Sequence, residues 1–146
     1  FSMERAGTLP TGDLIRLCFS GNYTEQEIHH MITARGGLYA YLGTNNLNTI
    51  EKRINDGDEK ASFIMYAMAY QVAKEVGAMC TVLEGKPDAI ILSGDLFHQR
   101  FFTEHLTRKI EKIAQIAIYP DEDDVDALAM NAIGVMKGEI EVLEYK

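Results

Sequence analysis

The sequence predicts an α/β fold that is rich in helix and contains few strands. Two patterns support this prediction. Residues 89–92 are four consecutive apolar residues, β-branched at Ile90 and Ile91, which is typical of a strand covered on both faces of a parallel sheet. Residues 58–83 repeat apolar side chains at steps of three and four, which indicates one long helix. The 146 residues suffice for one domain, or a piece of one, with a buried core.

The amino-terminal region begins as a loop and continues as short helices. Gly7, Pro10 and Gly12 lie within six residues of each other, so we expect residues 1–13 to be a loop. Thr11 or Asp13 can cap a short helix that ends near residue 18. Thr24 and Glu27 have the spacing of a capping box, so we expect a second helix that runs to Met31.

Gly36 and Gly37 break the chain before the next helices. Residues 48–55 are expected to form a helix closed by Asp56-Gly57. The helix over residues 58–83 has so wide an apolar stripe that we expect it to be largely buried. A core helix and a subunit interface are both open for this stripe, because Met and Tyr also suit interfaces.

The carboxyl-terminal half alternates strands and helices. A Ser93-Gly94 turn follows the first strand. The expected elements after this turn are, in order, an amphipathic helix over 101–114, a second buried strand over 115–119, a helix over 125–137 and an edge strand over 139–145.

The stretch from Asp88 to Gln99 therefore combines a strand, a turn and a helix start. Ligands of parallel sheets usually lie beyond the carboxyl end of a strand, where Ser93 and Gly94 fall. Backbone N–H groups at the helix start could bind a phosphate or a nucleoside hydroxyl. The alternative, which the local sequence favours, is a plain connection in which Gly94 adopts a positive φ.

An acidic run, residues 121–124, precedes the last expected helix. Carboxylates in a first helical turn interact favourably with the helix dipole, and this is the simpler interpretation. The second interpretation is a magnesium site, because Mg²⁺ binds one or two carboxylates together with phosphate oxygens and water. His98 and His105 are two helical turns apart, so we do not expect them to share a metal ion.

Composition excludes several classes of partner. The chain has 14 Lys and Arg against 22 Asp and Glu, a net charge of −8, so we expect neither nucleic-acid nor membrane binding. No apolar run approaches the roughly 20 residues of a membrane span. Cys18 and Cys80 have neither metal-site nor disulfide spacing, so we expect a reducing, cytoplasmic location. The first residues lack an initiator Met and a leader, which suggests a piece of a longer chain.

Three segments, in one order, resemble the carboxyl-terminal portion of the acetate and butyrate kinase family. They are residues 1–21 (with Glu-Arg-Ala-Gly-Thr-Leu-Pro-Thr-Gly-Asp-Leu), residues 36–46 (Gly-Gly-Leu-Tyr-Ala-Tyr-Leu-Gly-Thr-Asn-Asn) and residues 88–138. Acetate kinases carry an Arg where Pro10 stands, so the butyrate kinase branch is the closer match. The resemblance implies a ribonuclease H-like fold, as in sugar kinases and actin. It also implies reversible phosphate transfer from ATP to a short carboxylate with Mg²⁺, by a homodimer.

The resemblance also implies a place in the fold and a set of site residues. Residues 1–146 would form the carboxyl-terminal part of the second kinase lobe, with the amino-terminal lobe and an opening β-hairpin before Phe1. The implied site residues are Arg5 and Asp13 as catalytic residues facing the acyl phosphate, Asn46, Asn48, Ser93, Gly94 and Asp95 around adenosine, and Asp124 near Mg²⁺.

Several of these positions depart from the family pattern. The departures are Asp95 for a Gly, Asn46 for an Asp, Asn48 for an Arg and Asp124 for a Glu. Asp95 places an anion at the nucleotide, and like charges about 4 Å apart at an effective dielectric of about 20 repel by about 4 kcal/mol. Three functions remain open. The first is a butyrate-phosphorylating kinase, of which we expect this fragment alone to be inactive. The second is a degenerate, non-catalytic binding or dimerisation module, and the third is a carboxylate kinase with another chain-length preference.

Overall fold

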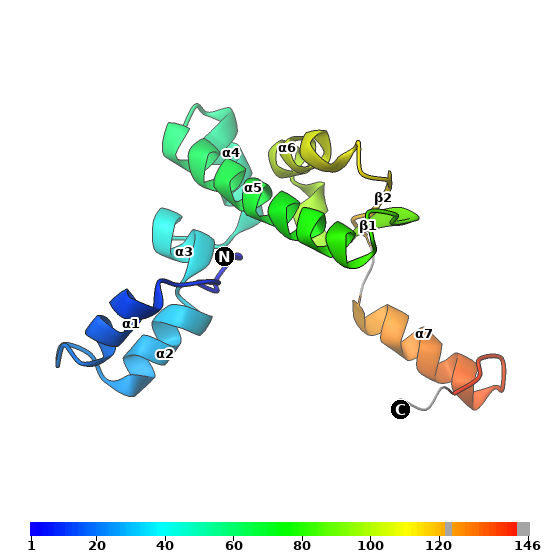
Figure 1. Cartoon of the computed structure of the whole chain (residues 1–146), viewed down its shortest axis with the longest axis horizontal. Coiled ribbons are helices and arrows are strands. Elements are labelled where there is room, and N and C mark those ends of the chain that lie inside the picture. The colour runs from blue at the N-terminus through cyan, green and yellow to red at the C-terminus, as the bar shows by residue number, and fades with distance from the viewer. Residues whose placement is uncertain (122–123, 143–146) are drawn as a thin grey trace.

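The computed structural model of the chain describes residues 1–121 and 124–142. Along this described part, the elements are α1 (Thr11–Cys18), α2 (Glu25–Thr33), α3 (Gly37–Leu42), α4 (Leu47–Asn55), α5 (Glu59–Val82), β1 (Ala89–Ser93), the 3₁₀ helix η1 (Asp95–His98), α6 (Arg100–Ile110), β2 (Gln115–Tyr119) and α7 (Asp124–Met136). The helices α4, α5 and α6 form one group, α1 and α2 lie together at one end of the molecule, and α7 lies at the other (Figure 1). The predicted helix-rich α/β architecture is confirmed.

Helix capping follows the sequence at α2 but not at α1. Thr24 Oγ1 accepts a hydrogen bond from Glu27 N, and Thr24 N donates to Glu27 Oε2 at 2.7 Å, so the predicted capping box is confirmed. The predicted cap of α1 is wrong, because Pro10 is the N-cap residue and no side chain caps this helix. Asp13 instead lies in the first turn and pairs with Arg16 at 2.6 Å.

Gly36 and Gly37 allow the first residues of the chain to pack against the start of α3. Leu38 N donates to Ser2 O at 3.0 Å, and Gly36 N donates to Glu4 O at 2.8 Å. Gly37 has a φ of 53°, and a Cβ at this position would clash with the Ser2 carbonyl oxygen. Only glycine therefore permits this close approach of two backbone segments.

Asp58 joins the ends of three helices. Its Oδ1 accepts from Ala61 N at 2.9 Å and caps α5, while its Oδ2 accepts from Arg53 Nε at 2.8 Å. Arg53 Nη1 also donates to the Leu42 carbonyl oxygen at the end of α3, at 2.8 Å. The Ala61 N–H and then the Arg53 guanidinium hold the pKa of Asp58 below its ordinary value of 3.8.

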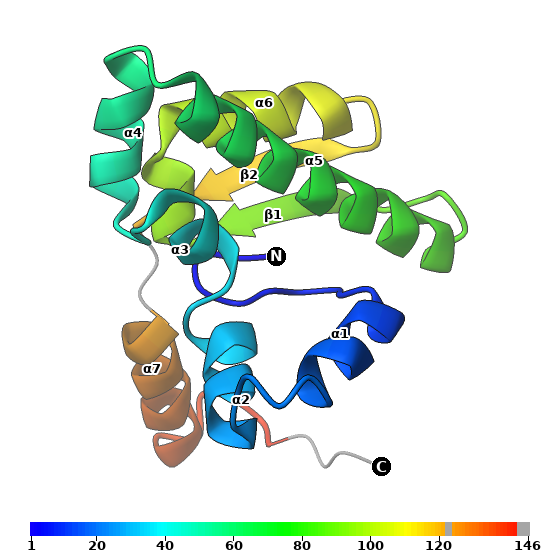
Figure 2. The same cartoon turned by 90° about the vertical axis from the view of Figure 1, so that its left-hand side faces the viewer.

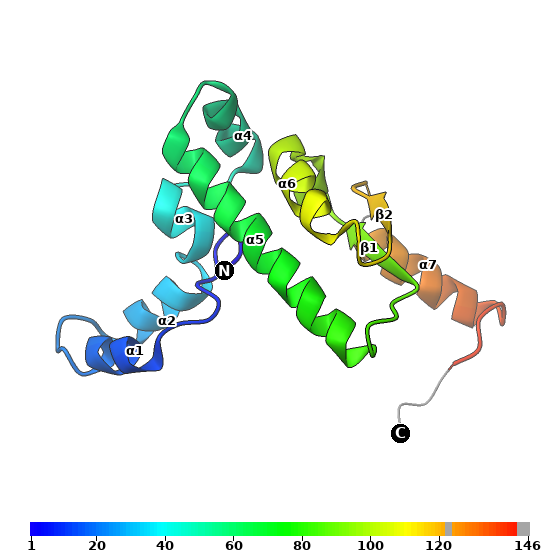
Figure 3. The ribbon, with the colours of Figure 1, turned by 45° about the horizontal axis from the view of Figure 1, so that its top comes forward.

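The hydrophobic core lies between α5 and α6, with contributions from α3, α4 and β1. Its fully buried larger side chains are Phe102, Leu38, Ile50, Met65, Met68, Leu106 and Ile110. The prediction that α5 is largely buried is correct for its first half only. Met79 is 55% exposed and Val82 is 71% exposed. Val72 and Val76 still pack against the core cluster, but the last turns of α5 extend beyond α6 (Figure 3).

The two strands form a parallel pair in which Ile91 lies opposite Ala117. Figure 2 shows both strands pointing the same way, with α6 returning the chain between them. Leu92 is buried against the helices, but Ile91 on the opposite face is 69% exposed. The prediction of strands covered on both faces is therefore wrong for this chain, because α5 and α6 cover one face only.

The region after β2 differs from the prediction in one respect. The helix predicted over 125–137 is confirmed as α7, which lies apart from the α5–α6 pair (Figure 3). Residues 139–142 form no strand, and the remainder of the edge strand predicted over 139–145 lies outside the described residues. None of the helices in the described part of the chain has the length and apolarity needed to span a membrane.

The low pKa of Asp58 makes a prediction about pH and stability. A carboxyl group whose pKa is lower in the folded state stabilises that state above its unfolded pKa and loses this effect as pH falls through its folded pKa. The Asp58→Asn variant keeps a capping oxygen but removes the charge that Arg53 contacts. We expect it to be less stable than the wild type at pH 5 to 7, with the difference closing below pH 3.8.

Urea unfolding of both proteins across this pH range measures the difference. The Asp56→Asn variant is the control. It alters an exposed carboxylate at the end of α4, two residues before Asp58, and it should show a smaller pH-dependent difference. A difference for Asp58→Asn that stays constant from pH 7 to pH 2 would contradict the interpretation.

Candidate functional site

A cavity of about 640 Å³ lies where the amino-terminal ends of α4 and η1 meet. Its lining residues are Met3, Asn45, Asn46, Leu47, Asn48, Asp95, His98 and Gln99. They come from three separate stretches of the chain. The structure therefore places three of the predicted adenosine residues, Asn46, Asn48 and Asp95, around one space.

Both apolar and polar contacts bring these stretches together. Ile50 of α4 is fully buried in the same cluster as Phe102 of α6. Above this contact, Arg100 N donates to Glu51 Oε1 at 2.9 Å, so the first turn of α6 is bonded to α4. The starts of α4 and α6, which lie beside the cavity, are thus held together by one hydrophobic core.

Asn46 has a structural role at the cavity. Its Oδ1 accepts from Thr49 N at 2.9 Å and caps α4. Because this oxygen is engaged, Asn46 can offer a ligand its Nδ2 as a donor. Its neighbour Asn45 donates to Glu4 Oε2 at 3.3 Å, which connects the cavity to the first residues of the chain.

Asp95 is the first residue of η1 and contributes a carboxylate to the cavity wall. Ser93 and Gly94 lie immediately before it, at the end of β1, and border the cavity without lining it. Gly94 has a φ of 97°, as the turn predicted from sequence requires. A Cβ at Gly94 would meet nothing within 4 Å, so its backbone faces open space.

His98 connects the cavity to the end of β2. Its Nε2 lies 3.1 Å from Asp121 Oδ1, and both side chains are exposed. Sequence reasoning considered His98 only as a possible partner of His105, and the two are separate: His105 stacks on Phe101 with ring centroids 4.2 Å apart. The cavity residues that were not among the predicted site residues are Met3, Asn45, Leu47, His98 and Gln99.

The other predicted site residues do not line this cavity. Arg5 is exposed, and its backbone N donates to Ser2 Oγ at 3.2 Å. Asp13 is paired with Arg16 on the exposed surface of α1. Asp124 begins α7, but its side chain lies outside the described residues, so the predicted magnesium ligand stays a prediction. Among the residues described, no group of three or more His, Cys, Asp or Glu could hold a metal ion.

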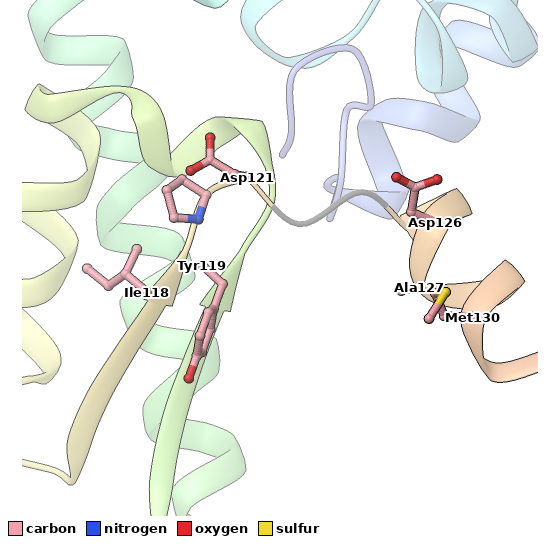
Figure 4. Close-up of a pocket in the computed structure, with 7 residues that line it drawn as sticks. Ile118, Tyr119, Asp121, Asp126, Ala127 and Met130 are labelled. Carbon is pink, nitrogen blue, oxygen red and sulfur yellow. The ribbon is translucent and has the colours of Figure 1, made fainter. Parts of the chain in front are cut away.

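A second cavity, of about 580 Å³, separates the end of β2 from α7 (Figure 4). It is lined by Ile118, Tyr119, Pro120, Asp121, Asp126, Ala127 and Met130. Figure 4 shows Asp121 and Asp126 on opposite sides of this gap. The wall combines apolar side chains with two carboxylates, and this suits neither a phosphate nor another anion.

The lining of the first cavity suits a nucleoside better than its phosphates. Asparagine amides and one carboxylate can bond the amino groups and hydroxyls of a nucleoside. Phosphates prefer Lys, Arg or a cluster of backbone N–H groups, and none of the Lys and Arg residues that the structure describes lines the cavity. If a nucleotide binds here, its phosphates must lie elsewhere.

A polar cavity at the carboxyl end of a parallel strand is typical of nucleotide-binding α/β proteins. Comparison with known proteins defines the class further. The sequence pattern of the Acetokinase family matches residues 3–133, and the chain belongs to this family.

Known relatives match along the whole chain. It is 47% identical over 146 residues to butyrate kinase 2 of Clostridium acetobutylicum and 46% identical to a probable butyrate kinase of Bacteroides thetaiotaomicron. In each case the match covers all of this chain and 41% of the relative's length. The chain thus spans about two fifths of these relatives.

Solved structures confirm the acetate-kinase-type fold. The structure superposes on acetate kinase of Porphyromonas gingivalis with a TM-score of 0.79 over 92% of this chain and 40% of that one, at 19% identity. A propionate kinase of Francisella tularensis gives a TM-score of 0.68 over 82% of this chain and 37% of that one, at 16% identity. At these identities the likeness concerns the fold.

The cap formed by Asn46 leads to a stability prediction. The Asn46→Ala variant should lose about 1 kcal/mol of unfolding free energy, because the loss of an N-cap side chain leaves Thr49 N without its acceptor. The Asn46→Asp variant keeps the acceptor and should retain wild-type stability within about 0.5 kcal/mol. Urea unfolding at neutral pH measures both. Equal losses in the two variants would show that the oxygen does not cap α4.

Proposed function

We propose that this chain supplies the nucleoside-binding side of a kinase that transfers phosphate from ATP to butyrate, giving butyryl phosphate and ADP. Membership of the Acetokinase family supports phosphoryl transfer to a carboxylate. Relatives named as butyrate kinases, 42–47% identical along essentially the whole chain, favour butyrate as the acceptor. From the family resemblance we further propose that the chain is part of the second kinase lobe of a cytoplasmic homodimer.

The observation that carries this proposal is the joint cavity of Asn46, Asn48 and Asp95. Sequence resemblance assigned these residues to adenosine from two segments about 50 positions apart, and both segments line one polar space. In this proposal Ser93 and Gly94 seat the nucleoside, since the Gly94 backbone faces open space. Asn46 Nδ2 donates to the nucleoside, while its oxygen stays on α4.

The remaining roles follow from charge. Phosphoryl transfer depends on positioning of the reactants and on neutralisation of the phosphoryl oxygens. Arg5 would neutralise the acyl-phosphate side, Asp13 would orient groups beside it, and Asp124 would support Mg²⁺, which supplies charge neutralisation when bound. Arg5 and Asp13 lie outside the cavity, and none of the described Lys and Arg residues lines it. In this proposal, the triphosphate and the carboxylate are bound together only with groups beyond those that line this cavity.

We therefore expect the 146-residue chain to show no kinase activity by itself. Incubation with ATP, Mg²⁺, butyrate and hydroxylamine should give no hydroxamate above the protein-free background. Butyrate kinase 2 of Clostridium acetobutylicum, in the same assay, is the positive control. Turnover by the pure chain would contradict this assignment of roles.

A second candidate function is a non-catalytic binding or dimerisation module. The Asp95 carboxylate favours it, because this anion faces the space that the nucleotide would occupy. A like-charge contact near 4 Å would oppose binding by about 4 kcal/mol, and the repulsion expected here is smaller, because the phosphates would lie outside the cavity and solvent screens this exposed side chain.

Asp95 variants distinguish the two functions. If repulsion by Asp95 limits binding, the Asp95→Asn variant should bind ADP about tenfold more tightly than the wild type, measured by titration calorimetry at low salt. Asp95→Gly tests bulk in addition to charge. Asp88→Asn, an exposed carboxylate that does not line the cavity, is the control and should not change the affinity. Micromolar ADP binding by the wild type, unchanged in Asp95→Asn, would argue that Asp95 does not hinder the nucleotide.

A further inference from the structure

The cavity wall contains a buried amide, Gln99. Its side chain is 4% exposed, and among the residues described it is the one buried polar side chain. A buried amide must satisfy its donors and acceptors within the protein, because the loss of water is costly otherwise. The neighbours of Gln99 therefore determine which way its amide is turned.

The hydrogen-bonding partners select one of two orientations of the Gln99 amide. In one orientation, Nε2 faces Asn48 Oδ1 at 3.4 Å and Oε1 faces two other acceptors. After a half-turn of the amide, Nε2 donates to Glu51 Oε2 at 2.5 Å and to the Leu47 carbonyl oxygen at 3.2 Å. The second orientation makes more and shorter bonds, one of them to a carboxylate, so it is favoured.

This orientation determines how Asn48 is turned. With Nε2 directed at Glu51, Gln99 presents Oε1 to Asn48, at the position of the 3.4 Å contact. Asn48 must then direct its Nδ2 at Gln99, because two oxygens facing each other would repel. The Asn48 Oδ1 then takes the place that its Nδ2 held, and Asn48 is one of the residues that line the cavity.

We propose that Glu51 and Gln99 are positioning residues that turn the Asn48 amide so that its oxygen accepts a hydrogen bond from the ligand. Asn48 Oδ1 then joins the Asp95 carboxylate as an acceptor in the cavity wall, and Asn46 Nδ2 is available there as a donor. Such a wall selects a nucleoside that offers a hydrogen-bond donor to Asn48. The donor is an exocyclic amino group or a ribose hydroxyl. This inference rests on the proposed nucleoside site.

Glu51 is well placed to determine the direction of this series of bonds. Its Oε2 accepts from Gln99 and its Oε1 accepts from Arg100 N at 2.9 Å, so both oxygens are engaged by donors. A carboxylate can only accept, so Gln99 cannot reverse while Glu51 is present. In the Glu51→Gln variant, the introduced amide can still accept from Arg100 N and can donate to Gln99, which removes the stronger of the two acceptors that oppose the reverse orientation, while the Leu47 carbonyl oxygen stays.

A double-mutant cycle without ligand tests the positioning. Asn48→Asp places a second acceptor against Gln99 Oε1, so it should lower stability while Glu51 prevents Gln99 from turning. In the Glu51→Gln background, Gln99 can turn and donate to the new carboxylate, so part of this loss should be recovered, the remainder being the lost bond to the Leu47 carbonyl oxygen. Asn22→Asp, in the exposed loop between α1 and α2, is the matched control and should be additive with Glu51→Gln. Additive effects of Asn48→Asp and Glu51→Gln in urea unfolding would overturn the positioning role.

Nucleoside analogues test the selection. If Asn48 Oδ1 accepts from the amino group, purine riboside should bind about fivefold to tenfold more weakly than adenosine, a loss typical of one hydrogen bond. If it accepts from ribose, 2′,3′-dideoxyadenosine should show this loss instead. The Glu51→Gln variant should bind adenosine more weakly and lose the discrimination while remaining folded. Equal binding of all three nucleosides overturns the inference, whereas absence of adenosine binding, even with Asp95→Asn, overturns the proposed function together with the selection.

Discussion

The apolar contact between α5 and α6 is the constraint on which the site depends. Met65 and Met68 of α5 are buried against the same cluster as Phe102 and Leu106 of α6, and Ile50 of α4 joins them. Each large side chain in this cluster contributes about 1.5–3 kcal/mol by its burial. The starts of α4 and α6, which lie beside the cavity of Asn46, Asn48 and Asp95, therefore cannot separate without opening the core.

The exposed parts of the fold follow from the same packing. The α5–α6 pair covers one face of the strands, so Ile91 on the other face is left 69% exposed. The second half of α5 extends past α6, and Val82 is 71% exposed. The chain spans about two fifths of its relatives, and none of the Lys and Arg residues that the structure describes lines the polar cavity of Asn46, Asn48 and Asp95.

Local patterns in the sequence were enough to predict most elements, but not their environment. The Thr24 capping box and the periodic stripe of α5 report hydrogen bonds and packing within one helix, and both are confirmed. Burial of β1 on both faces was wrong, because covering a face depends on distant segments. The grouping of Asn48 with Asp95 came from family resemblance. Gln99 was missed, because the burial of a lone glutamine leaves no periodic signal in a sequence.

The Asp95 carboxylate and the hydrogen bonds of Glu51, Gln99 and Asn48 would affect ligand binding in different ways. In the proposed function, Asp95 would act through charge on the strength of nucleotide binding, and salt would screen this effect. The bonds from Glu51 through Gln99 to Asn48 act through direction, since a turned amide exchanges a donor for an acceptor without changing the charge. Because Gln99 is buried, salt reaches these bonds much less. The salt dependence of nucleoside discrimination, compared with that of nucleotide affinity, therefore separates the two contributions within one protein.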